Sequence, residues 1–206
     1  MKTWSLLGVS AALLLFGASQ ASADITNIWY ADDGDGGLVC PTYPPTSGDS
    51  LDIYGDQYWG PGHVLVNIAT DTAEDPTLTL NNVIDNDTGF DWTGYIVNVY
   101  LNKSFTFSGI SVANPSGWTG AVTISPAFNG MSGLWEGQIT YTGGTPVNTI
   151  IGDPNNNLDF TYKVTFSGAT QYTLTEEVTP VPEPGAVLLT LVGLAVFCGI
   201  SRFRRE

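Results

Sequence analysis

The chain has 206 residues, enough for one domain of ordinary size and two terminal segments. Only 13% of the residues are charged and the net charge is −14, which argues against a nucleic-acid-binding protein because carboxylates repel phosphate. Residues 24–181 hold 18 carboxylates against two lysines, so a divalent cation is the small partner that the charge favours. The alternative is that the acid only keeps an exported domain soluble.

The first 23 residues have the three parts of a secretory signal peptide. Lys2 supplies the positive charge, residues 6–16 form a short apolar run, and Ala21 and Ala23 occupy the small-residue positions of an A-x-A cleavage site. The run is shorter than the ~20 residues of a membrane-spanning helix. We therefore predict cleavage after Ala23, with a retained N-terminal anchor as the alternative.

An acidic, glycine-rich cluster follows at residues 32–37. Asp33 and Asp35 match the opening D-x-D of a calcium-binding loop, in which carboxylates surround the ion on a tight turn. The match ends there, because the fifth position is Gly37 and the twelfth is not glutamate. Calcium is thus the one candidate cofactor, and a solvated acidic turn is the alternative.

Catalytic groups are sparse. His63 is the single histidine, and no serine lies in a G-x-S-x-G elbow, no Cys/His spacing suits zinc, and no glycine loop suits phosphate. Cys40 lies in the body and Cys198 in the apolar tail, so we expect no disulfide between them. Burial is the common state of a free cysteine, and an intermolecular bridge is the alternative for Cys40. The sequence predicts a protein without enzymatic activity.

The body shows period-two alternation rather than helical periodicity. Residues 158–166 place Phe160, Tyr162, Val164 and Phe166 on one face and polar residues on the other. Clusters of Gly, Pro, Asn and Asp separate such segments. We predict an all-β fold, a single antiparallel β-sandwich ectodomain at residues 24–178. The predicted strands are 25–30, 63–70, 77–81, 94–101, 104–108, 134–142, 158–166 and 171–178.

Tryptophans in turn-rich segments are candidates for sugar binding, because an exposed ring can stack on a sugar. Trp59 lies in the stretch Tyr-Trp-Gly-Pro-Gly, and Trp118 follows Pro-Ser-Gly. The alternative is that these rings fill the core of the sandwich, where aromatic side chains are common.

The C-terminal segment, residues 179–206, has three parts in order. Pro182-Glu183-Pro184 is extended by its prolines, residues 184–203 form a largely apolar run, and three arginines follow, Arg202, Arg204 and Arg205. Twenty residues of helix span about 30 Å, the thickness of a bilayer core. The arginines belong on the cytoplasmic side, so we predict one C-terminal transmembrane helix with the body outside.

This order resembles the PEP-CTERM sorting domain of Gram-negative bacteria, over about the last 26 residues. The resemblance implies that Pro182, Glu183 and Pro184 are the sorting motif and that Arg202, Arg204 and Arg205 are the basic stop. It also implies an exosortase partner, a membrane enzyme that recognises and cuts the tail. An ordinary single-pass anchor is the alternative. Residues 86–97 resemble a segment of uncharacterised proteins with such tails, which implies no function.

The sequence therefore predicts where the protein goes better than what it does. The expected precursor sits in the inner membrane with its body in the periplasm, and processing delivers it to the cell surface or extracellular matrix. The expected function is that of a non-enzymatic surface or matrix protein, and the resemblance implies association with exopolysaccharide or biofilm. A calcium- or carbohydrate-binding module is the second interpretation, and an enzyme is the third.

Overall fold

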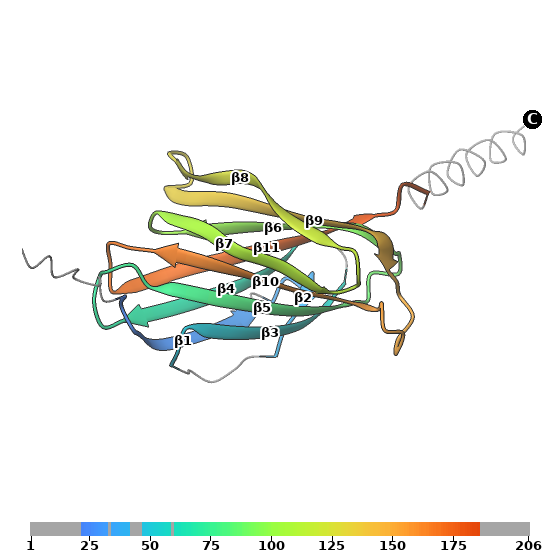
Figure 1. Ribbon diagram of the computed structural model, residues 1–206, viewed down its shortest axis with the longest axis horizontal. Coiled ribbons are helices and arrows are strands. Elements are labelled where there is room, and N and C mark those ends of the chain that lie inside the picture. The colour runs from blue at the N-terminus through green and yellow to red at the C-terminus, as the bar shows by residue number, and fades with distance from the viewer. Residues whose placement is uncertain (1–21, 33, 42–46, 59, 186–206) are drawn as a thin grey trace, which may run out of the picture.

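The structure is a computed structural model that describes residues 22–32, 34–41, 47–58 and 60–185, and the fold is all-β (Figure 1). Eleven strands form two sheets that face each other across one core. The strands are β1 (Ile25–Asp32), β2 (Leu38–Val39), β3 (Ser50–Gln57), β4 (Gly62–Thr70), β5 (Thr77–Asn86), β6 (Trp92–Leu101), β7 (Phe105–Asn114), β8 (Thr119–Asn129), β9 (Leu134–Val147), β10 (Asn157–Phe166) and β11 (Gln171–Pro182).

Several sequence predictions lie outside the described residues. They are most of the signal peptide with Ala21, the apolar tail segment with Arg202, Arg204 and Arg205, and the side chains of Asp33 and Trp59. Within the described part of the chain, no helix is both long and apolar enough to span a membrane.

The six-stranded sheet has the order β1-β4-β11-β6-β9-β8, and the five-stranded sheet has the order β2-β3-β5-β10-β7. Neighbouring strands are antiparallel except β3 and β5, which run parallel. This pair corrects the expectation of a purely antiparallel sandwich. The parallel arrangement is possible because β4, which joins the two strands along the chain, crosses to the other sheet.

Alternating burial builds the core. Along β10, Leu158, Phe160, Tyr162, Val164 and Phe166 are buried and the residues between them are not, as the sequence pattern predicts. Aromatic rings from the two sheets meet in the middle, with 4.6 Å between the ring centroids of Tyr141 and Phe160. Burial of such side chains contributes about 2–3 kcal/mol each, so the two inner faces hold the sheets together.

Three strands lack a sequence prediction, namely β2, β3 and β8. Strand β8 is an edge strand whose residues are mostly exposed on both sides, and it contains Pro126 and two irregularities in its register with β9. A strand without one buried face has no period-two signal. Strand β7 likewise extends to Asn114, well beyond the predicted segment 104–108.

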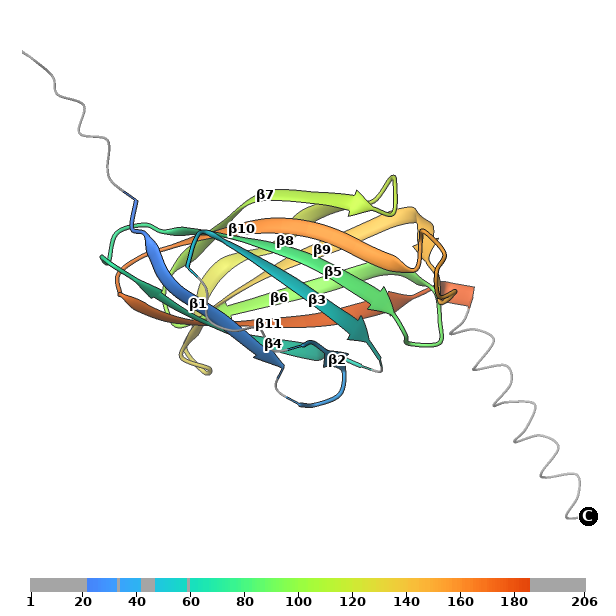
Figure 2. The same cartoon turned by 90° about the horizontal axis from the view of Figure 1, so that it is seen from below.

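The last strand continues past the predicted boundary at Val178. Strand β11 ends at Pro182, and Pro180 still faces the core. The strand lies between β4 and β6 inside the six-stranded sheet. Figures 1 and 2 show that β1 begins at one end of the long axis and β11 ends at the other. The described chain therefore leaves the sandwich at the end opposite to the one it enters.

Candidate functional site

The acidic cluster forms a loop between β1 and β2 that is closed by its own carboxylates. Asp32 Oδ1 accepts a hydrogen bond from the Gly34 amide at 2.7 Å, and Asp35 Oδ1 accepts one from the Gly37 amide at 2.7 Å. Gly34 and Gly36 have φ of 79° and 78°, which side chains rarely adopt. Local turn formation thus explains why aspartate and glycine alternate here.

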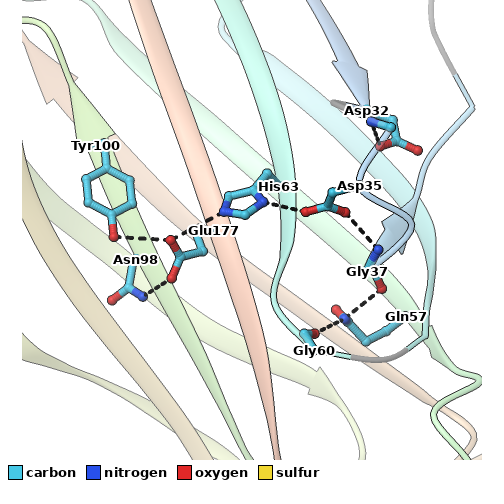
Figure 3. A network of polar contacts seen from close by, with 10 residues as sticks. Asp32, Asp35, Gly37, Gln57, Gly60, His63, Asn98, Tyr100 and Glu177 are labelled. Carbon is cyan, nitrogen blue, oxygen red and sulfur yellow. Dashed lines mark hydrogen bonds and ion pairs between the residues drawn. The ribbon is translucent and has the colours of Figure 1, made fainter.

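Close backbone contacts fix this loop against the start of β4. A Cβ added to Gly37 would lie 2.0 Å from the Pro61 carbonyl oxygen, and one added to Gly62 would lie 2.2 Å from the Leu38 Cβ. The buried Gln57 side chain also donates from Nε2 to the carbonyl oxygens of Gly37, at 2.8 Å, and Gly60, at 2.9 Å (Figure 3). The loop is therefore held in one position over β4.

His63 lies on the outer face of β4 between two carboxylates (Figure 3). Its Nδ1 is 2.6 Å from Asp35 Oδ2, and its Nε2 is 3.4 Å from Glu177 Oε2. Glu177 also accepts hydrogen bonds from Asn98 Nδ2 at 3.0 Å and from the Tyr100 hydroxyl at 3.3 Å. This places His63 in an interior strand of the six-stranded sheet.

The contacts continue across the outer face of the six-stranded sheet. Gln138 Nε2 donates to Asn98 Oδ1 at 2.8 Å, and Thr123 Oγ1 donates to Gln138 Oε1 at 2.8 Å. The strand registers place these residues in line, since His63 pairs with Glu177, Glu177 with Asn98, and Asn98 with Gln138. We call this set the polar row; it comprises Asp35, His63, Glu177, Asn98, Gln138 and Thr123.

The polar row connects neighbouring strands. Both ring nitrogens of His63 face carboxylates. Asp35 directs one oxygen to Gly37 and the other to His63. Among the described residues, no three His, Cys, Asp or Glu side chains are grouped so as to hold a metal ion. Calcium binding stays a prediction, since Asp33 lies outside the described residues.

Cys40 is buried and forms no disulfide, which confirms the expectation of burial. Burial, together with the nearby carboxylates of Glu176, Asp32 and Asp56, raises the pKa of its thiol to about 12. A thiol with such a pKa stays protonated at neutral pH, so Cys40 is not a nucleophile.

Trp118 belongs to the core, so the prediction that it stacks on sugars is wrong. Its side chain is buried, and its indole N–H donates to the Thr145 carbonyl oxygen at 2.5 Å. The ring covers Gly143, where an added Cβ would lie 2.0 Å from Trp118 Cδ1. The turn residues before Trp118 indicated a loop, but the ring folds back over the sheet.

Trp29 lies on an outer face of the sandwich. It is half-buried on β1, between the buried Ile28 and Tyr30. It forms one wall of a groove of about 260 Å³ on the outer face of β1, β4 and β11. The sequence gives no clear signal for it, because Ile28, Trp29 and Tyr30 are all apolar and the strand is irregular between Ile25 and Asn27. The outward-facing residues of the groove are Asn27, Trp29, Asn67, Ala69, Gln171 and Thr173.

One carboxyl group lies inside the sandwich. Glu176 takes a core-facing position on β11, between Leu174 and Val178, and is fully buried. Burial raises its pKa to about 8. The Tyr162 hydroxyl is near enough to lower that pKa somewhat, but neither Glu176 oxygen has a partner in hydrogen-bond geometry among the described residues. The group is therefore a neutral acid at physiological pH.

Both ends of the described chain contact the body. Pro182 pairs with Trp92 at the end of β11, and the Glu183 amide donates to the Asp91 carbonyl oxygen at 3.1 Å. The Pro182-Glu183-Pro184 segment thus begins within the sheet, and of these three residues only Pro184 is fully exposed. At the other end Ala23 is buried, and the Asp24 nitrogen is 2.8 Å from Asp71 Oδ1.

No protein-family model, no curated protein and no solved structure matches this chain.

Proposed function

We propose that the chain is a non-enzymatic exported protein of the cell surface or extracellular matrix, sorted and processed by an exosortase through a PEP-CTERM tail. The signal peptide with Ala21 and Ala23 starts export, and the apolar segment with its arginines holds the precursor in the inner membrane. The body then faces the periplasm until processing delivers it to the surface, where it associates with exopolysaccharide.

The observation that carries this proposal is the tripartite C-terminal pattern, Pro-Glu-Pro followed by an apolar run and a basic cluster. The position of the motif supports it. Pro182 ends β11, an interior strand, so the tail continues from the middle of a sheet and not from a loosely attached edge. Because β11 ends at one end of the long axis (Figure 2), the body would stand directly on the membrane with its opposite end outermost.

The experiment compares the wild-type chain with a variant in which Pro182, Glu183 and Pro184 are all alanine. Both are expressed in a host that has an exosortase and in its exosortase deletion, and each is fractionated and weighed as intact protein. The wild type should lose about 20 C-terminal residues only where the exosortase is present, since a spanning helix is not released by simple dissociation. The variant should stay membrane-bound with its tail in both hosts.

A matched control replaces three exposed residues at the other end of the sandwich, Thr72, Glu74 and Asp75, with alanine. This control should be processed like the wild type. Because Pro182 pairs within the sheet, the wild type, the motif variant and the control must have the same melting temperature for their processing to be compared. Processing of the motif variant at the wild-type rate would exclude this kind of sorting signal, and a wild type that keeps Glu206 would be an ordinary membrane-anchored protein.

A carbohydrate-binding module is the second candidate, and the groove beside Trp29 favours it. A calcium-binding module remains tied to Asp33 and Asp35. Calorimetric titration of the body with calcium tests it, with Asp33→Ala plus Asp35→Ala as the variant. An enzyme is the least supported candidate, because the His63 ring contacts carboxylates in place of a nucleophile.

A further inference from the structure

We propose that the groove beside Trp29 binds a sugar ring of a neutral polysaccharide. This inference rests on the proposed function, because it names the ligand class through which a surface protein would hold a matrix. It also moves the sugar site from the loops of Trp59 and Trp118 to the outer face of β1, β4 and β11.

The chemistry of the groove suits an uncharged polyhydroxyl ligand. No charged residue lines it, although the body around it carries a large excess of carboxylates. Asn27, Asn67 and Gln171 each provide an amide that can donate and accept, and Thr173 provides a hydroxyl. Trp29 adds a flat ring beside them, an apolar surface against which the C–H face of a sugar can pack. An anionic polymer would meet no cation in this groove.

The strand registers explain the shape of the groove. Trp29 pairs with Asn67, and Asn67 pairs with Thr173, which makes one row across β1, β4 and β11. In the adjacent row, Ala69 lies between Asn27 and Gln171. Because the methyl group of Ala69 is much smaller than the side chains around it, the surface is hollow there.

An unsatisfied donor in the groove points to a ligand. Among the described residues, the Asn67 Nδ2 nitrogen is enclosed and has no hydrogen-bond partner. Buried amide donors are usually paired, and an unpaired one costs free energy. Because this nitrogen is enclosed, a sugar hydroxyl or ring oxygen would accept its hydrogen bond once the Asn67 side chain turns towards the groove. The volume of about 260 Å³ suits a single sugar ring rather than a long oligosaccharide.

The groove is also far from the tail. Gln171 begins β11 and Pro182 ends it, which separates the two by about 35 Å along an extended strand. A body that stands on the membrane at Pro182 would present the groove on its outer end. That is the end at which a polymer outside the cell would be met.

The test uses the body at residues 24–185, which contains all eleven strands and their core. Isothermal titration calorimetry measures binding of cellohexaose, maltohexaose, mannohexaose and chitohexaose, with an oligoguluronate as the anionic comparison. We expect saturable binding of at least one neutral hexasaccharide and none of the oligoguluronate.

The variants are Trp29→Ala, Trp29→Tyr and Gln171→Ala, with Thr140→Ala as a control on the same sheet face outside the groove. Gln171→Ala removes an exposed side chain and should weaken binding about fivefold to tenfold, the loss expected for a hydrogen bond. Trp29→Ala should weaken it more than tenfold, and Trp29→Tyr should retain more affinity because it keeps a ring. Thr140→Ala should bind like the wild type.

Three results would overturn the inference. They are no binding of any neutral hexasaccharide, equal binding of the oligoguluronate, or wild-type affinity in both Trp29→Ala and Gln171→Ala. If Trp29→Ala fails to fold, Gln171→Ala decides alone. The body used here lacks the tail, so failure of sugar binding leaves the sorting experiment unaffected, and failure of sorting leaves this titration unaffected.

Discussion

The buried Glu176 makes the stability of the body depend on pH in a direction opposite to that of a paired surface carboxylate. Its pKa rises from 4.5 to about 8 in the folded protein, chiefly through burial. The folded state therefore binds a proton that the unfolded chain releases. The contribution of Glu176 to stability is therefore greatest below pH 4.5, declines as the pH rises from 4.5 towards 8, and then levels off.

The size of this effect follows from the two pKa values. The interval between 4.5 and about 8 corresponds to about 5 kcal/mol lost across the full range, and to about 3 kcal/mol lost by pH 7. That is a large part of the 5–15 kcal/mol that a domain typically has. The substitution Glu176→Gln removes the ionisation but keeps the shape, so it should abolish most of the decline.

The assay is urea unfolding of residues 24–185 at intervals from pH 5 to pH 9, for the wild type and Glu176→Gln. Glu74→Gln is the matched control, the same change at an exposed position outside the core. It should retain the decline of the wild type. Glu176→Gln should be the more stable protein from neutral pH upwards, with a nearly flat profile.

Other groups near Glu176 titrate outside this window. Tyr162, Tyr141 and Tyr95 face it from β10, β9 and β6, and burial raises the pKa of each well above 10. Cys40, beside β2, has a pKa of about 12. Parallel stability profiles for wild type and Glu176→Gln between pH 5 and pH 8 would refute the reasoning.

Three further predictions concern the ends and the loops. N-terminal sequencing of the secreted protein should begin at Asp24, and recovery of Lys2 would contradict the cleavage. The new ammonium group of Asp24 would then face Asp71. Asp71→Asn should therefore lower the unfolding free energy of that form by less than about 1 kcal/mol. His63→Ala should leave the fold intact but expose the acidic loop to limited proteolysis, because Asp35 and Glu177 lose their common partner. An unchanged cleavage pattern would show that the close glycine contacts are sufficient to hold the loop. Cys40 should resist iodoacetamide at pH 8 in the folded protein and react once urea unfolds it; rapid labelling of the native protein would contradict its burial.

The alternation of polar and apolar residues predicted most of the strands. Residues 158–166 and 171–178 were recognisable as strands because one face of each is buried, and the structure confirms both. Strand β8 shows the limit of that signal. Its residues are exposed on both sides, so its place depends on pairing with β9 and not on a pattern of its own.

The candidate site was less accessible to sequence reasoning, because its residues come from distant parts of the chain. Trp118 looked available for stacking but folds into the core, whereas Trp29, which was not among the candidates, lies on an outer face. No local pattern indicated that Gly143 leaves room for the Trp118 ring.

Glu176 and Glu177, adjacent on β11, show what the local sequence pattern determines and what the tertiary structure determines. The apolar Leu174 and Val178 already place Glu176 on the inner face and Glu177 on the outer one, since side chains alternate along a strand. Alternation cannot say what either acid meets. Only the register with β4 and β6 brings His63 and Asn98 to Glu177, and only the packing of the second sheet removes water from Glu176. Composition and period thus set the all-β class and the inward or outward direction of each side chain, while pairing between distant strands decides which groups touch and therefore their charge, because desolvation and contact act through space.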